Sequence, residues 1–333
     1  MGSKISRFNY NTQPPQLVAY IRRSAESRSQ IRDIVNDLLQ EIPGEFIEGN
    51  VVCTFFFITD IKNGFDVEIS IPIKNSYNNK SVKTKEIGTS EYLSYIHQGS
   101  IQELQKSQEL LFSFAYSLGL NSDEFMREVY LDNNDPAGNQ IEIQLMIHNW
   151  ESLFETNLIE ILGSKKAKKV LDENAESLLD VPLAKRYESI KNYLKKMKEI
   201  TTEEERFEII SKCSHIFPKN MIEKLRIVYQ NALQTQKPIS AIDETLRYMS
   251  ERRAWGVPPK REGYIMFTSK KPRKPEEFNK AETKAEKMAA YCYCAIIRDM
   301  YGEGMDPEFC KCGAGWPRQI WEGILERKIK VDV

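Results

Sequence analysis

This sequence has few histidines, no long apolar run and almost no net charge. Only three of its 333 residues are histidine, and no apolar run approaches the roughly 20 residues that a membrane-spanning helix needs. The N-terminus lacks the apolar core of a signal peptide. We therefore expect a cytoplasmic protein with no membrane partner.

A charge excess of either sign is also missing. Lys and Arg total 47 against 48 for Asp and Glu, which gives a net charge of -1. Binding to DNA depends on a basic surface that neutralises phosphates, so we expect no nucleic-acid partner. The sequence has neither a glycine-rich phosphate loop nor a serine nucleophile elbow, and this disfavours nucleotide and serine-hydrolase chemistry.

The length indicates two domains, each able to bury its own core. Residues 1–148 alternate between strand and helix patterns, whereas residues 149–333 are mostly helical with a small sheet. The expected class is α+β. Helices are predicted near 150–163, 173–200, 218–234 and 239–253. Another is predicted after residues 201–205, where Thr201 or Thr202 with a glutamate three positions on gives a capping-box signature.

The first 148 residues contain an internal repeat. Strand, helix, strand, strand are predicted at 17–21, 24–41, 51–58 and 65–73, and the same order returns at 91–96, 101–118, 125–131 and 140–147. The last strand of each half shares one pattern, with Glu68 and Glu142 at matching places. This predicts a pseudo-duplicated antiparallel sheet.

Tyr95–Ser100, which enters a helix, and Gln140–Ile147, which closes the second half, carry a resemblance to the gyrase-inhibitor-like effector-binding domain. The resemblance covers nearly all of residues 5–148. It implies a curved sheet whose groove holds a small aromatic or cationic molecule. It also implies that Glu142 is the acidic ligand contact.

Strand alternation places Glu142 and Gln144 on one face, opposite Ile141 and Ile143. Glu142 therefore points away from the helix-packed core. A carboxylate bordered by aromatic rings would attract a cation. Further candidate ligand contacts are Glu68, Phe55, Phe57, Tyr95 and Tyr130. The alternative is that the glutamates face solvent and the aromatic side chains belong to the core.

Four of the six cysteines lie close together in the sequence, as Cys292, Cys294, Cys310 and Cys312. A Cys-x-Cys pair on extended backbone directs both sulfurs to one face, and four thiolates suit zinc or an iron–sulfur centre. The alternatives are a redox or nucleophilic thiol and simple burial. Cys213 and His215 form a further sulfur–imidazole pair that could replace one of these ligands or act as a thiol with its base. Buried structural residues are the simpler interpretation.

The C-terminal part resembles an uncharacterised bacterial cysteine-rich family related to vinyl-4-reductase-like sensor domains. The resemblance rests on Ser211–Pro218, Arg261–Thr268, Tyr291–Cys294 and Phe309–Leu325. It implies a cysteine-held zinc beside an aromatic-ligand pocket. Relatives continue past a strand expected at Lys328–Val333, so we expect this domain to be truncated.

Three functions remain open. The first is a small-molecule sensor or carrier that acts through a homodimer or a regulatory partner. The second is a hydrolase or thiol-dependent enzyme that uses Glu142 or the cysteines. The third is a structural zinc protein without a ligand. We favour the first, and fold resemblance by itself does not establish function.

Overall fold

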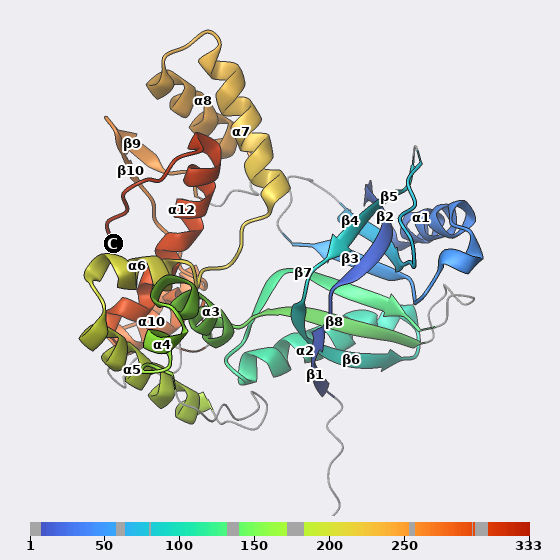
Figure 1. The fold of residues 1–333 in the computed structure, drawn as a ribbon, viewed down its shortest axis with the longest axis horizontal. Helices are drawn as coiled ribbons and strands as arrows, with labels where there is room; N and C mark the ends of the chain where they lie inside the picture. The colour runs from blue at the N-terminus through green and yellow to red at the C-terminus, as the bar shows by residue number, and fades with distance from the viewer. Residues whose placement is uncertain are drawn as a thin grey trace, which may run out of the picture. The chain divides into compact units, whose positions relative to one another are not determined.

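The computed structural model describes residues 8–57, 64–79, 81–131, 140–171, 183–252, 257–294, 296 and 306–333. The chain divides into two compact units (Figure 1). The N-terminal unit comprises residues 1–117 and 122–148, and the C-terminal unit comprises residues 118–121 and 149–333. In the described part, no helix is both long and apolar enough to cross a membrane.

Among the residues that the structure describes, the N-terminal unit has one eight-stranded sheet and two long helices. This confirms the predicted α+β class. The helices are α1 (Arg28–Glu41) and α2 (Leu104–Ser117), with short 3-10 turns at Gly44–Phe46 and Ile101–Glu103. The strands are β1 (Phe8–Gln13), β2 (Gln16–Ala25), β3 (Val52–Phe56), β4 (Phe65–Pro72), β5 (Lys83–Ile87), β6 (Ser90–Gln98), β7 (Asn121–Tyr130) and β8 (Gln140–His148).

The strand order shows the predicted repeat directly. It runs β1-β6-β8-β7-β3-β4-β2-β5, so β2-β4-β3 of the first half mirrors β6-β8-β7 of the second half across the β3–β7 pair. The pairing of β3 with β7 is antiparallel, with Val52 opposite Val129. The two edge strands, β1 and β5, were not predicted. Residues 132–139, between β7 and β8, lie outside the described residues.

The sheet must be strongly curled. Pro14 and Pro15 alone link β1 to β2, and three peptide steps span at most about 11 Å. In a flat sheet, the five strands that lie between β1 and β2 would separate them by about 29 Å. The short link from β5 to β6 imposes the same condition. The sheet therefore folds round on itself and has one concave face.

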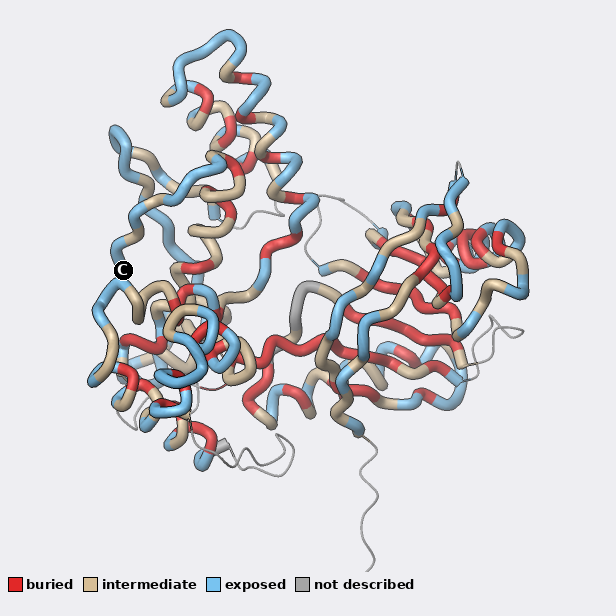
Figure 2. The backbone as a smooth tube through the Cα atoms, in the orientation of Figure 1, coloured by how far each residue is buried: buried red, intermediate tan, exposed pale blue. Residues whose placement is uncertain are grey.

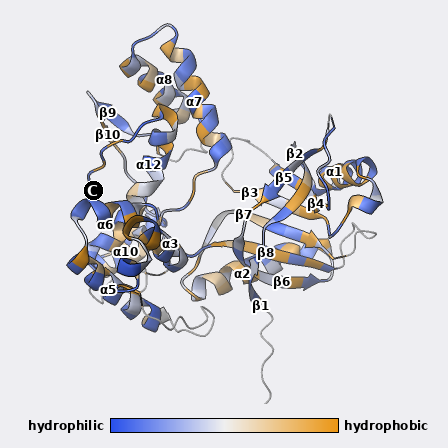
Figure 3. Cartoon of the chain, in the orientation of Figure 1, coloured by the Kyte–Doolittle hydropathy of each residue, from blue (hydrophilic) through white to orange (hydrophobic). Residues whose placement is uncertain are grey.

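Both helices cover the other, apolar face of the sheet. Alternate strand residues such as Val67, Ile69 and Ile71 are fully buried there, and α1 contributes Ile31, Ile34, Val35 and Leu38 (Figure 2). Hydrophobic and hydrophilic colouring both appear on α1 (Figure 3), as an amphipathic helix requires. The polar side of each strand is thus left for the concave face.

The C-terminal unit is mainly helical, as predicted. Its helices are α3 (Trp150–Leu162), α4 (Ser164–Ala167), α5 (Leu183–Ile200), α6 (Glu203–Ser211), α7 (Lys219–Leu233), α8 (Pro238–Ser250), α9 (Pro275–Lys280), α10 (Lys284–Tyr291) and α12 (Cys312–Leu325). Its small sheet pairs β9 (Lys260–Glu262) with β10 (Ile265–Phe267). Thr202 and Glu205 form the predicted capping box at the start of α6.

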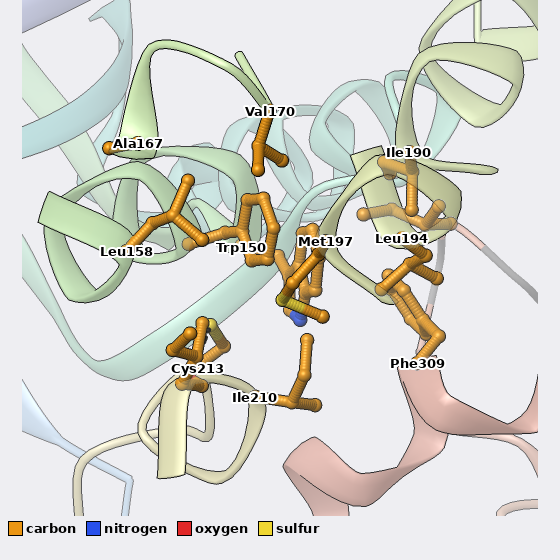
Figure 4. Close-up of a cluster of buried hydrophobic side chains, with 13 residues drawn as sticks. Trp150, Leu158, Ala167, Val170, Ile190, Leu194, Met197, Ile210, Cys213 and Phe309 are labelled. Carbon is orange, nitrogen blue, oxygen red and sulfur yellow. Dashed lines mark hydrogen bonds between the residues drawn. The ribbon is translucent and has the colours of Figure 1, made fainter. Parts of the chain in front are cut away.

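Aromatic rings form the centre of the C-terminal core (Figure 4). Trp150 stacks on Phe154 with ring centroids 4.9 Å apart, and Phe309 lies 4.5 Å from the Trp150 ring. Leu194 and Met197 of α5 and Ile210 of α6 complete the cluster. Residues distant in sequence therefore share one core.

Two expectations about this unit were wrong. Cys310 lies in a 3-10 turn at Pro307–Lys311 and Cys312 begins α12, so the second Cys-x-Cys pair is not on extended strand backbone. The residues from Lys328 to Val333 form no strand. A strand needs a neighbouring strand with which to pair. The alternating pattern of residues 328–333 does not show whether such a neighbour exists.

Candidate functional site

The strand register assigns each polar side chain of the sheet to one of its faces. Glu68 pairs with Thr54, and Thr54 pairs with Arg127. On the neighbouring strands Glu142 lies opposite Ile96, and Gln144 lies opposite Ser94. All of these alternate with residues that pack against the helices, so they belong to the concave face.

This concave face is polar and yet buried. Its side chains include the following, each at most 7% exposed: Thr54, Glu68, Ser70, Ser94, Arg127 and Gln144. In the described part of the N-terminal unit, neither α1 nor α2 covers this face, because both helices contact Glu128 on the opposite one. A polar, shielded concavity is a suitable place for a small polar molecule.

Several of these charges are already paired. The Lys85 ammonium lies 2.6 Å from a Glu68 carboxylate oxygen. Arg22 donates two hydrogen bonds to Asp66, at 3.0 and 2.9 Å, and its guanidinium lies 3.8 Å from the centre of the Phe56 ring. These contacts fix the charged groups along one side of the face.

Arg127 and Glu142 have neutral partners instead. Arg127 donates a hydrogen bond to the side-chain oxygen of Gln13, and Glu142 accepts one from Gln144 at 3.1 Å. Burial lowers the pKa of Arg127, although the Glu68 carboxylate and Tyr92 act in the opposite direction. Burial also raises the pKa of Tyr92, and the Glu142 carboxylate adds to this rise.

The structure separates the six predicted ligand contacts into two groups. Glu68 and Glu142 share the concave face. Phe55, Phe57, Tyr95 and Tyr130 lie on the opposite face, because they alternate with concave-face residues along their strands. Phe57 contacts Phe112 of α2, for example, and Phe8 stacks on Phe114 beside Tyr95. A ligand contact by any of the six stays a prediction.

Sequence reasoning missed Arg127 and Tyr92 on the concave face, whereas strand alternation had placed Gln144 on the same face as Glu142. Arg127 could be placed only through its pairing with Thr54.

A buried ion pair on the helix-covered face was also missed. Glu128 is fully buried and accepts two hydrogen bonds of 2.7 Å from Arg28 and one of 2.9 Å from Gln108. Arg28 begins α1 and Gln108 belongs to α2, so one carboxylate ties both helices to β7. This arrangement is structural.

The predicted metal ligands lie in the C-terminal unit. Cys292, Cys310 and Cys312 are near enough to influence one another electrostatically, and burial raises the pKa of each thiol, that of Cys312 to about 12. Within the described ranges, no group of three or more His, Cys, Asp or Glu side chains is arranged to hold a metal ion. Zinc binding by these residues and Cys294 stays a prediction.

Cys213 is poorly suited to nucleophilic chemistry. Burial raises the pKa of its thiol to about 12, and the thiol donates a hydrogen bond to the Ile209 carbonyl oxygen at 3.3 Å. The reactive species of a cysteine is the thiolate, which is scarce at neutral pH when the pKa is this high. Cys213 therefore acts as a buried core residue.

Comparison with known proteins identifies the N-terminal unit. Residues 8–148 match the family model described as the GyrI-like small molecule binding domain. No curated protein sequence matches the chain. The match ends at residue 148, so the resemblance of the C-terminal part to sensor domains stays a prediction.

Similar solved structures include an EcmrR–DNA complex, at 19% identity and a TM-score of 0.36 over 44% of this chain and 59% of that chain. SAV2435 bound to tetraphenylphosphonium is 13% identical, with a TM-score of 0.31 over 44% of this chain and 96% of that chain. A hydrolase encoded by lin2189 from Listeria innocua is 11% identical, with a TM-score of 0.33 over 42% of this chain and 91% of that chain. These sequence identities and TM-scores are too low to support a functional argument. From the family match, residues 8–148 are a GyrI-like small-molecule binding domain.

Proposed function

We propose that the chain is an effector-binding protein whose small-molecule ligand occupies the concave face of the N-terminal sheet. The observation that carries this proposal is a set of nearly buried polar side chains on the sheet face opposite to α1 and α2, the helices described in the N-terminal unit. Burying polar groups costs free energy unless they gain partners, so a face built this way favours a polar guest.

Glu142 is the acidic contact in this proposal. It lies on the concave face, it is only partly buried, and its described partner is the neutral amide of Gln144. Glu68, by contrast, is held by Lys85 at 2.6 Å. A carboxylate that is not neutralised within the protein can attract a ligand cation.

Calorimetric titration with benzylamine and benzyltrimethylammonium tests this role. Replacing Glu142 with Gln should weaken binding of both cations about tenfold, because each loses the attraction of a carboxylate in a shielded site, and tenfold corresponds to about 1.4 kcal/mol. The matched control is Glu86→Gln, which removes an exposed carboxylate from β5 on the other face of the sheet. Equal affinities for wild type and Glu142→Gln would contradict the assignment of Glu142.

A further inference from the structure

The concave face leaves two charges of opposite sign without an ionic partner. In the described part of the chain, neither the guanidinium of Arg127 nor the carboxylate of Glu142 lies within 4.0 Å of an opposite charge, whereas Glu68 and Asp66 are both paired. Arg127 is 5% exposed, so its charge is nearly removed from water.

A buried guanidinium gains more from a carboxylate acceptor than from a neutral one. The hydrogen bond from Arg127 to the Gln13 amide satisfies one of its five N–H donors with a neutral acceptor. The planar guanidinium fork matches a carboxylate, which can accept two parallel hydrogen bonds. Arg127 therefore suits the anionic end of a ligand better than it suits a purely cationic guest.

Aromatic rings lie beside this charge. The Arg127 guanidinium lies 5.3 Å from the centre of the Phe125 ring, and Phe125 lies 5.8 Å from Phe56. Phe56 pairs directly with Phe125 across β3 and β7, so both rings are on the concave face. They provide an apolar wall for the uncharged body of a ligand.

We infer that the ligand is a small aromatic zwitterion. Its carboxylate binds Arg127 and its ammonium binds Glu142. This inference rests on the proposed function and makes it more specific, because the Glu142 contact alone would accept any organic cation. The Arg127 contact adds selectivity for molecules that carry both charges.

The test compares three probes that share one benzene ring: benzylamine, benzoate and 4-(aminomethyl)benzoate. Wild type should bind the zwitterion at least about tenfold more tightly than benzylamine, as expected for an added charge-assisted contact. In Arg127→Gln this advantage should disappear while benzylamine affinity stays unchanged. Arg127→Lys keeps the charge without the fork and should retain only part of the advantage.

The matched control is Arg23→Gln. Arg23 lies on β2 but on the helix-covered face, where it pairs with exposed Asp37 at 2.9 Å, so all three affinities should equal those of wild type. Far-ultraviolet circular dichroism confirms the fold of each variant. If Arg127→Gln failed to fold, the comparison of Arg127→Lys with wild type would carry the test.

The outcomes separate this inference from the proposed function. If benzylamine binds through Glu142 but the zwitterion gains nothing from Arg127, the inference is overturned and the proposed function stands. If no probe binds wild type at millimolar concentration, both are overturned. A zwitterion advantage that persists in Arg127→Gln would likewise overturn the assignment of its carboxylate to Arg127.

Discussion

Tyr92 reports the charge of the concave face. Burial raises its pKa, the Glu142 carboxylate raises it further, and Arg127 lowers it. In an ultraviolet titration of the folded protein, the phenolate of Tyr92 should therefore appear at higher pH than that of a free tyrosine, near 10. Glu142→Gln should shift this midpoint downward, and Tyr92→Phe identifies the signal by removing it.

The shift also has a consequence for stability. The folded protein holds the Tyr92 proton more tightly than the unfolded chain does. The resulting stabilisation is complete below about pH 10 and is lost as the pH rises through the folded-state pKa. A midpoint that did not move in Glu142→Gln would show that the two side chains are not electrostatically coupled.

Glu128 shows what a single buried charge contributes. Glu128→Gln should lower the free energy of unfolding by about 2–3 kcal/mol, because Arg28 loses its ionic partner in a mostly buried position. This is less than the roughly 3–5 kcal/mol expected for a fully buried pair, since a third of the Arg28 side chain is exposed. Urea denaturation measures the change, with exposed Glu45→Gln as control. Equal stability of the two variants would contradict this account.

At the residue scale, the sequence allowed only part of the site to be predicted. The two-residue alternation of side chains along a strand correctly predicted that Glu142 points away from the apolar face, because its neighbours Ile141 and Ile143 are fully buried. The same period cannot show which face one strand shares with another strand, because that depends on pairing register. This is why Phe55 and Tyr95 were associated with glutamates that lie on the opposite face.

Two elements of the C-terminal unit approach each other closely at Gly315. A Cβ atom added there would lie 1.8 Å from the Ser211 carbonyl oxygen and 2.5 Å from the Ser214 hydroxyl oxygen. Gly315→Ala should therefore force α12 away from the end of α6 and destabilise the protein by about 1–3 kcal/mol.

Gly313 of the same helix is the matched control for this prediction. A Cβ atom there would meet only the end of the flexible Lys270 side chain, at 3.3 Å. Gly313→Ala should be neutral or stabilising by up to about 1 kcal/mol, because alanine favours helix. Thermal unfolding compares both variants with wild type. A similar melting temperature for the two would refute the close approach.

At the element scale, capping residues and hydrophobic periodicity identified most of the long helices. Both are local signals, and the Thr202 capping box shows how they fix a helix start. The edge strands β1 and β5 carry mainly polar residues, and pairing with β6 and β2 is what makes them strands. The helical setting of Cys312 likewise depends on packing that short motifs do not encode.

At the scale of the whole molecule, the concave site results from long-range pairing. The repeat predicted two equivalent halves, but not that each edge strand would pair with the other half. That exchange closes the curl and brings the side chains of β1, β6, β7 and β8 to one face. Residues from both halves are thus required for the site, as Arg127 bonded to Gln13 illustrates.

The proposed site belongs entirely to the N-terminal unit, which has its own sheet and core. A fragment of residues 1–148 should therefore fold and bind 4-(aminomethyl)benzoate with an affinity within about twofold of the full chain, a difference below about 0.5 kcal/mol. Calorimetry on both proteins, with circular dichroism to confirm folding, makes the comparison. A folded fragment that bound at least about tenfold more weakly would show that residues 149–333 contribute to the site, because that loss is about 1.4 kcal/mol.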